Sequence, residues 1–203
     1  MSRNRPRQNG IRAAIAAAAA RIMAENGIDN FALAKRKAAK QLGATEKQGL
    51  PANEEVEVEL RTYLELYRAD EHPDRIRGLR RIALSAMREL AEFSPYLTGP
   101  VLKGIAGPYA EIELQLFPDS GKDVEIFLLN RNIPFSSADA RRYSGDRARS
   151  VTQFELEWEG APVKLSVFDS RDERIALKTT QVGRVMDRAG IPEVSALLDE
   201  RHA

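Results

Sequence analysis

The apolar and polar residues of this chain follow two different periods, one in each half. From about Ile11 to Phe93 the apolar positions recur every three or four residues, which is the spacing of an amphipathic helix. After Ser94 and Pro95 they occur in short alternating or apolar runs separated by turn residues, which is typical of strands. We therefore expect an α+β protein in which an N-terminal helical bundle precedes a mixed, mostly antiparallel sheet with helices.

Breaks at glycine, proline and asparagine divide the first half into four predicted helices. These helices are expected at residues 10–26, at 31–42, from a cap at Asn53 onwards, and at about 74–93. Residues 1–9 are expected to form a disordered basic arm. We place the domain boundary near residue 95, with a helical domain at 1–95 and an α+β domain at 96–203.

In the second half, turn residues separate the runs that we expect to form strands and helices. Strands are expected at 101–106 and 111–117, from 133 onwards, and at 152–158 and 163–168, the last two as an antiparallel hairpin. Helices are expected at 121–131, where Ser120 provides the cap, and at 191–201. The polar segment 141–150 is expected to form a loop.

Two glutamates alternate with apolar residues in the predicted strand at 111–117. Glu111 and Glu113 are two positions apart, so their carboxylates share one face of that strand. Two such carboxylates can hold a divalent metal when a third acidic group arrives from a neighbouring strand. The run around Trp158 alternates in the same way and offers Glu155 or Glu157 as that third group. The sequence therefore predicts a Mg²⁺ site.

A simpler explanation of the same alternation is a sheet with one buried face and one solvated face. In that case the carboxylates point outward, and Glu155 and Glu157 face Lys164 and solvent. The two explanations differ in whether the acidic residues converge on a cation, and the sequence leaves both open.

The order of the predicted elements resembles the nucleotidyltransferase superfamily of the DNA polymerase beta type. In that family a glycine turn precedes an acidic strand, and a later strand supplies a third carboxylate. Gly104 stands at the turn, Glu111 and Glu113 at the acidic strand, and Glu155 or Glu157 at the third position, so the resemblance covers about residues 97–168. It implies Mg²⁺-dependent transfer of a nucleoside monophosphate from a nucleoside triphosphate to an unknown acceptor, with the three glutamates ligating metal and Gly104 admitting the phosphates.

The chain departs from the family pattern at the turn and at the first carboxylate. Ile105 replaces a small residue, and Glu111 takes the place of an aspartate. The resemblance therefore also implies an alternative function. In this alternative the chain is a catalytically inactive relative that acts as a nucleotide-, RNA- or protein-binding module.

Lysines near the predicted turn and helix are the candidates for contacts with a triphosphate. Lys103 adjoins Gly104, and Lys122 follows Ser120 at the start of a helix, whose free N–H groups favour anions. A second basic group lies earlier in the chain and could contact nucleic acid: Lys35, Arg36, Lys37, Lys40 and Lys47. No aromatic residues are interleaved with that group to stack bases, so we favour a solvated helix face for it.

The composition narrows the possible chemistry. The 203 residues include 31 basic and 30 acidic side chains, a net charge of +1, so no global field attracts nucleic acid or lipid. The absence of cysteine excludes disulfides, thiolate zinc sites and a cysteine nucleophile, and it fits a cytoplasmic protein. With only His72 and His202, acid–base or metal chemistry falls to Asp and Glu. No 18-residue apolar segment predicts a membrane span.

Overall fold

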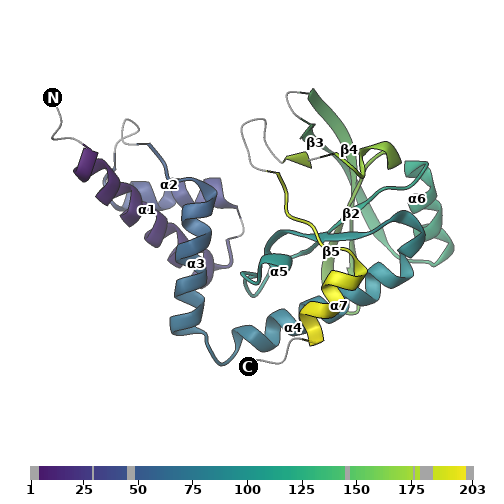
Figure 1. Cartoon of the computed structure of the whole chain (residues 1–203), viewed down its shortest axis with the longest axis horizontal. Coiled ribbons are helices and arrows are strands. Elements are labelled where there is room, and N and C mark those ends of the chain that lie inside the picture. The colour runs from purple at the N-terminus through teal and green to yellow at the C-terminus, as the bar shows by residue number, and fades with distance from the viewer. Residues whose placement is uncertain are drawn as a thin grey trace. The chain divides into compact units, whose positions relative to one another are not determined.

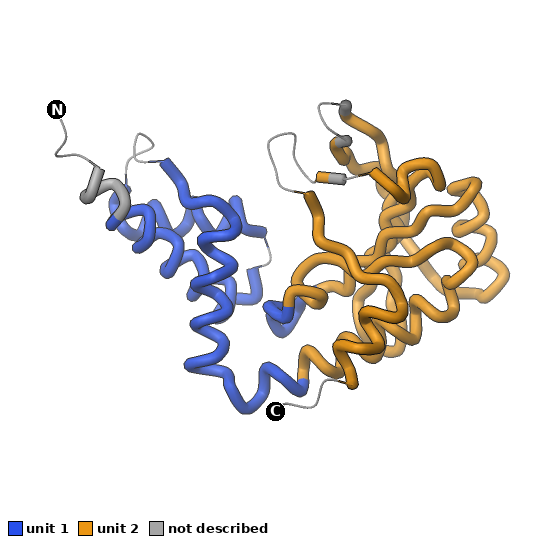
Figure 2. The backbone as a smooth tube through the Cα atoms, in the orientation of Figure 1, with its two compact units in different colours: residues 1–74, 104–110 blue, residues 75–103, 111–203 orange. Residues whose placement is uncertain are grey.

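The computed structural model describes residues 5–28, 30–44, 49–144, 147–175, 177–178 and 185–199. Lys47 and His202 therefore lie outside the described residues. The α+β class is confirmed, with helices at the N-terminal end preceding a mixed sheet (Figure 1). The chain divides into two compact units, residues 1–74 with 104–110 and residues 75–103 with 111–203 (Figure 2).

The first unit contains three helices: α1 (Arg5–Asn26), α2 (Phe31–Gln41) and α3 (Asn53–Tyr67). The backbone of α1 is helical from Arg5, five residues before the expected start. Alanines on α1 and α2, including Ala19, Ala34 and Ala38, are fully buried, and they pack with larger side chains of α3 such as Leu60. The alanine-rich run is therefore a close-packed helix contact.

The start of α3 differs from the expected cap at Asn53. Ala52 is the N-cap residue, and its backbone N–H donates to Oε2 of Glu55 over 2.6 Å. The same carboxylate accepts two further N–H groups from Arg12 of α1, at 2.8 Å from Nε and 2.6 Å from Nη2. Glu55 thus caps the start of α3 and ties this helix to α1. A hydrophobicity pattern does not reveal either contact.

The fourth helix belongs to the second unit, so the division differs from the expected boundary at residue 95. This helix, α4 (His72–Glu89), is followed by a short 3₁₀ turn, η2 (Ala91–Phe93). Arg80 of α4 donates to the backbone carbonyls of Val101 and Leu102 over 3.2 and 2.8 Å. The helical period continues through α4, so periodicity alone could not separate it from the first three helices.

The second unit is built on a six-stranded sheet with the order β1-β2-β5-β4-β3-β6. Its strands are β1 (Tyr96–Thr98), β2 (Ile112–Leu116), β3 (Phe135–Ser144), β4 (Arg147–Trp158), β5 (Ala161–Val167) and β6 (Leu177–Lys178). Only β2 and β5 pair in parallel among these neighbours, and the other pairs are antiparallel. The prediction of a mixed, mostly antiparallel sheet is therefore confirmed.

Two hairpins form the middle of the sheet. The expected hairpin of β4 and β5 is confirmed, and its turn places Glu159 and Gly160 at φ values of 50° and 79°, as a tight two-residue turn requires. The expectation of a loop over 141–150 is wrong, because β3 and β4 remain paired as far as Ser144 and Arg147. Polar side chains on both faces remove the alternation by which a strand is identified.

The expected strand at 101–106 is also wrong. Residues 99–103 form a short helix, α5 (Gly99–Lys103), in which Pro100 lies in the first turn, where its missing N–H costs nothing. The strand nearest to this segment is β1, which ends at Thr98, before the expected strand begins. An apolar run of this length fits a strand or a buried helical turn equally well, so its period could not decide between them.

Two further helices complete the unit, and both confirm predicted positions. Helix α6 (Gly121–Asn130) is capped by Ser120, whose Oγ accepts from the N–H of Lys122 over 3.3 Å. Helix α7 is Ile191–Asp199. Helix α6 buries Val124 and Leu128. Within the described ranges, no helix combines the length and the apolar character that a membrane span requires.

Candidate functional site on the polar face of the sheet

Three of the four central strands align charged side chains in one row. The register places Glu113 of β2 opposite Lys164 of β5, and Lys164 opposite Glu155 of β4. Residues in register on neighbouring strands lie about 4.8 Å apart and point to the same face. The predicted acidic positions are therefore brought onto one face of the sheet, with a lysine in the middle of the row.

Lys164 makes direct contacts with two of the carboxylates. Its Nζ donates to Oε2 of Glu111 and lies 3.8 Å from Oε1 of Glu155. The exposed fractions of the three side chains are 25% for Lys164, 39% for Glu111 and 54% for Glu155. The cluster is thus half-buried and open to solvent on one side.

The charges around Lys164 stabilise its ammonium form. Partial burial by itself lowers the pKa of Lys164, but the hydrogen bond to Glu111 and the charges of Glu111, Glu155 and Glu113 outweigh it, so the pKa is raised. The ammonium therefore stays charged at neutral pH. Its positive charge offsets part of the repulsion between the neighbouring carboxylates.

This arrangement does not fit a Mg²⁺ ion shared by Glu111 and Glu155, because the ammonium of Lys164 already lies on their oxygens. Mg²⁺ demands near-octahedral oxygen ligands at about 2.1 Å, and a lysine in their midst excludes it. No group of three Asp, Glu or His side chains suited to a metal occurs in the described part of the chain. The Mg²⁺ site stays a prediction, and the arrangement favours the alternative in which glutamates face Lys164.

Glu157, the other candidate for the third carboxylate, lies two residues after Glu155 on β4. It is opposite Pro162 of β5 and is exposed. Glu155 is therefore the β4 carboxylate that contacts Lys164.

Gly99 approaches the acidic strand closely. A Cβ at Gly99 would lie 2.8 Å from both Cδ and Oε2 of Glu113, and the residue has a φ of 72°. Both the space and the backbone angle therefore require glycine at this position. The carboxylate of Glu113 lies directly against the start of α5.

Gly104 has a structural role at the end of α5. Its φ of 70° is the left-handed conformation that follows many helices. Its carbonyl oxygen accepts a hydrogen bond from Nε2 of His72 over 2.8 Å. Ile105 is buried in the core of the first unit. Lys103 is the last residue of α5. These residues form a helix end and a core contact, and their expected role at a phosphate turn stays a prediction.

The other predicted basic residues belong to helices and not to the strands of the acidic row. Lys122 is exposed in the first turn of α6, and its side chain makes no hydrogen bond or ion pair within the described ranges. Lys35 of α2 donates to Pro51 O over 2.9 Å and to Asn53 Oδ1 over 2.8 Å, so it holds the first unit together. Lys37 and Lys40 lie on the same helix.

Arg142 is a functional candidate that sequence reasoning missed. The strand register places it on the same face as Glu155, and its Nη1 donates to the carbonyl of Arg141 over 3.0 Å. Its Nε is buried and has no hydrogen-bond partner in the described part of the chain. Partial burial lowers the pKa of Arg142, while the charge of Glu113 acts in the opposite direction. An arginine with a buried, unpaired donor is poised to bind an acceptor.

Gln115 presents a complementary acceptor on the same face. It follows Glu113 by two positions on β2, is 1% exposed, and donates from Nε2 to Sδ of Met186 over 3.6 Å. Its Oε1 is buried without a hydrogen-bond partner among the described residues. The next strand positions in that row, Ser166 and Gln153, bond each other over 2.9 Å. The polar face thus combines charged and neutral hydrogen-bonding groups.

Comparisons with protein-family models, with curated proteins and with solved structures find no significant match. The chemistry of the polar face is therefore argued from its own residues.

Proposed function

We propose that this chain is a nucleotidyltransferase-like protein that binds a nucleoside triphosphate on the polar face of its sheet without catalysing metal-dependent transfer. The observation that carries the proposal is the half-buried Arg142, which lies on the same face as Lys164 and whose Nε donor has no acceptor among the residues that the structure describes. A buried donor without an acceptor is costly, and a phosphate oxygen would relieve that cost.

The acidic residues of the same face complement the rest of a nucleotide. Ionised carboxylates accept hydrogen bonds from hydroxyl and amino groups, so Glu113 and Glu155 suit the ribose hydroxyls or the amino group of a base. Gln115 Oε1 offers one more acceptor of this kind. The phosphates of the nucleotide would bind Arg142, and its hydroxyl or amino groups would donate to Glu113 and Glu155. These contacts together would fix the orientation of the ligand.

Lys164 supports the noncatalytic form of the proposal. In metal-dependent phosphoryl or nucleotidyl transfer, the cation neutralises the developing charge on the phosphates. Here an ammonium is bound among the carboxylates, and β5 contributes a lysine to the row in which a third acidic ligand would be needed. The face therefore offers polar contacts for a nucleotide, and the ammonium of Lys164 lies among the carboxylates that would otherwise bind the activating ion.

Thermal unfolding with and without ATP tests this proposal. In EDTA, ATP is expected to raise the melting temperature, because a ligand at about 100 times its Kd stabilises the folded state by about 2.7 kcal/mol. Arg142→Gln is expected to weaken binding by about tenfold or more, the usual effect of losing a charge-assisted hydrogen bond.

Arg141→Gln is the matched control. Arg141 is the neighbouring residue on β3, is exposed, and points to the opposite face, so its loss changes the net charge equally and leaves the proposed site intact. The proposal fails if ATP gives no shift, or if both variants lower the shift equally. Mg²⁺-dependent release of pyrophosphate would contradict the noncatalytic form.

A further inference from the structure

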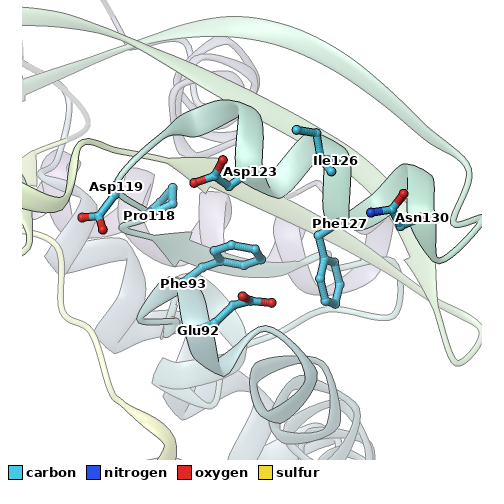
Figure 3. A pocket seen from close by; sticks show the side chains of 8 residues that line it. All are labelled: Glu92, Phe93, Pro118, Asp119, Asp123, Ile126, Phe127 and Asn130. Carbon is cyan, nitrogen blue, oxygen red and sulfur yellow. The ribbon is translucent and has the colours of Figure 1, made fainter.

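A pocket lies on the second unit among residues that the proposed nucleotide site does not use. It has a volume of about 380 Å³, at the small end of the range of roughly 300–1,000 Å³ for ligand pockets. Eight residues line it: Glu92, Phe93, Pro118, Asp119, Asp123, Ile126, Phe127 and Asn130. They come from η2, from the turn after β2 and from α6 (Figure 3).

Two aromatic rings form the apolar part of this pocket. Phe93 and Phe127 meet edge to face, with their ring centroids 5.6 Å apart. Phe93 is 5% exposed, and its carbonyl accepts from the N–H of Phe117 over 2.8 Å, which fixes η2 to the end of β2. The aromatic wall is therefore anchored by backbone bonding as well as by packing.

Three carboxylates surround the aromatic wall. Glu92, Asp119 and Asp123 line the pocket, and none of them makes a side-chain hydrogen bond or an ion pair with another described residue. In the view of Figure 3, the Phe93 ring lies between the side chains of Asp123 and Glu92. The nearby Glu89 differs, because it is paired with Arg131 over 2.8 Å. Among the described residues, these three carboxylates therefore have no cation paired with them.

One of the two rings, Phe127, already stacks with a guanidinium from within the chain. The Cζ atom of Arg131 lies 5.0 Å from the ring centroid of Phe127. A second arginine, Arg188, lies 4.7 Å above Tyr96 in the same unit. A guanidinium is planar, stacks on aromatic faces and pairs with carboxylates in a fork, which an ammonium does not do.

From these contacts we propose that the pocket binds the guanidinium of an arginine side chain presented by a protein partner. Charge complementarity selects a cation, and the aromatic wall selects a flat, weakly hydrated one. Ile126 and Leu129 are 53% and 59% exposed on α6, and Ile126 lines the pocket, so apolar surface is available beside it for the partner's neighbouring side chains. This proposal does not rest on nucleotide binding, since the two sites share no residue.

The test is a titration of the ¹⁵N-labelled full-length chain with N-acetyl-arginine amide, followed by NMR. Saturable shifts are expected at the amides of Glu92, Asp123 and Phe127. N-acetyl-citrulline amide has nearly the same shape without the charge and is expected to cause no saturable shift. The double substitution Glu92→Gln with Asp123→Asn is expected to weaken binding by about fivefold, the effect of losing two exposed ion pairs.

Glu125→Gln provides the matched control, because Glu125 is exposed on α6 and does not line the pocket. It is expected to leave the arginine affinity unchanged, and the amide spectrum of each variant reports whether it is folded. Equal shifts with citrulline, equal affinity for N-acetyl-lysine amide, or equal weakening by Glu125→Gln would overturn the proposal. So would the absence of any saturable shift.

Discussion

At the scale of single residues, Lys164 determines the chemistry of the polar face, because its ammonium lies among the carboxylates. Alternation alone predicts that Glu113 lies on the polar face of β2, since the direction of strand side chains is a local property, whereas Glu111 precedes β2 and contacts Lys164 through a hydrogen bond. Alternation cannot predict that Lys164 joins them, because the parallel pairing of β2 with β5 links segments some fifty positions apart. Arg142 was missed for a similar reason, since its place on the polar face depends on the register of a long hairpin.

Gly99 provides the first residue-scale prediction. Gly99→Ala is expected to destabilise the chain by about 1–2 kcal/mol from its left-handed φ alone, and by a further 1 kcal/mol or so because the new Cβ would meet Glu113. The free energy of unfolding in urea measures the loss.

Gly160→Ala is the control for backbone strain. Gly160 has a φ of 79° in the turn between β4 and β5, and a Cβ built there meets no heavy atom within 4 Å. Gly160→Ala should therefore lose the free energy of unfolding that comes from the left-handed φ, without any loss from a steric clash of the new Cβ. Equal losses in the two variants would mean that the approach of Glu113 to Gly99 adds nothing.

At the scale of elements, the starts of helices differ in how well the sequence predicts them. Ser120 was identified correctly as the cap of α6, because a serine before an apolar period is a local signal. The start of α3 was not, since its carboxylate cap, Glu55, lies inside the helix and also binds Arg12 from a distant segment. Local chemistry thus predicts a cap only where the capping residue acts alone.

Glu55 gives a prediction with a pH dependence. The hydrogen bond from Arg12 lowers the pKa of Glu55. A depressed folded-state pKa stabilises the fold above the ordinary value of about 4.3, and this contribution is lost as the pH falls through the lowered pKa. Glu55→Gln is therefore expected to cost about 1 kcal/mol at pH 7, and to make stability less dependent on pH below about 5.

Urea unfolding at a series of pH values checks this expectation. Glu65→Gln, an exposed change on the same helix, is the control and should follow the wild-type pH profile. A Glu55→Gln profile parallel to that of the wild type would show that the link between Arg12 and Glu55 does not stabilise the first unit.

At the scale of the whole molecule, the change of period predicted the fold class but not the division into units. The helical period runs on through α4, yet Arg80 bonds α4 to the backbone of α5, and this contact between distant segments leaves no trace in the pattern. Residues 104–110 return to the first unit, where Ile105 is buried in the core. Which element packs against which is a nonlocal property, so it required the structure.

The central claim is that the ammonium of Lys164 takes the place of a divalent cation among the carboxylates, and a Mn²⁺ titration of two proteins tests it most directly. Lys164→Asp replaces the cation with a carboxylate in register with Glu113 and Glu155. We expect millimolar Mn²⁺ to raise the melting temperature of this variant and to leave that of the wild type unchanged. A rise in the wild type that Glu113→Gln abolishes would contradict the account.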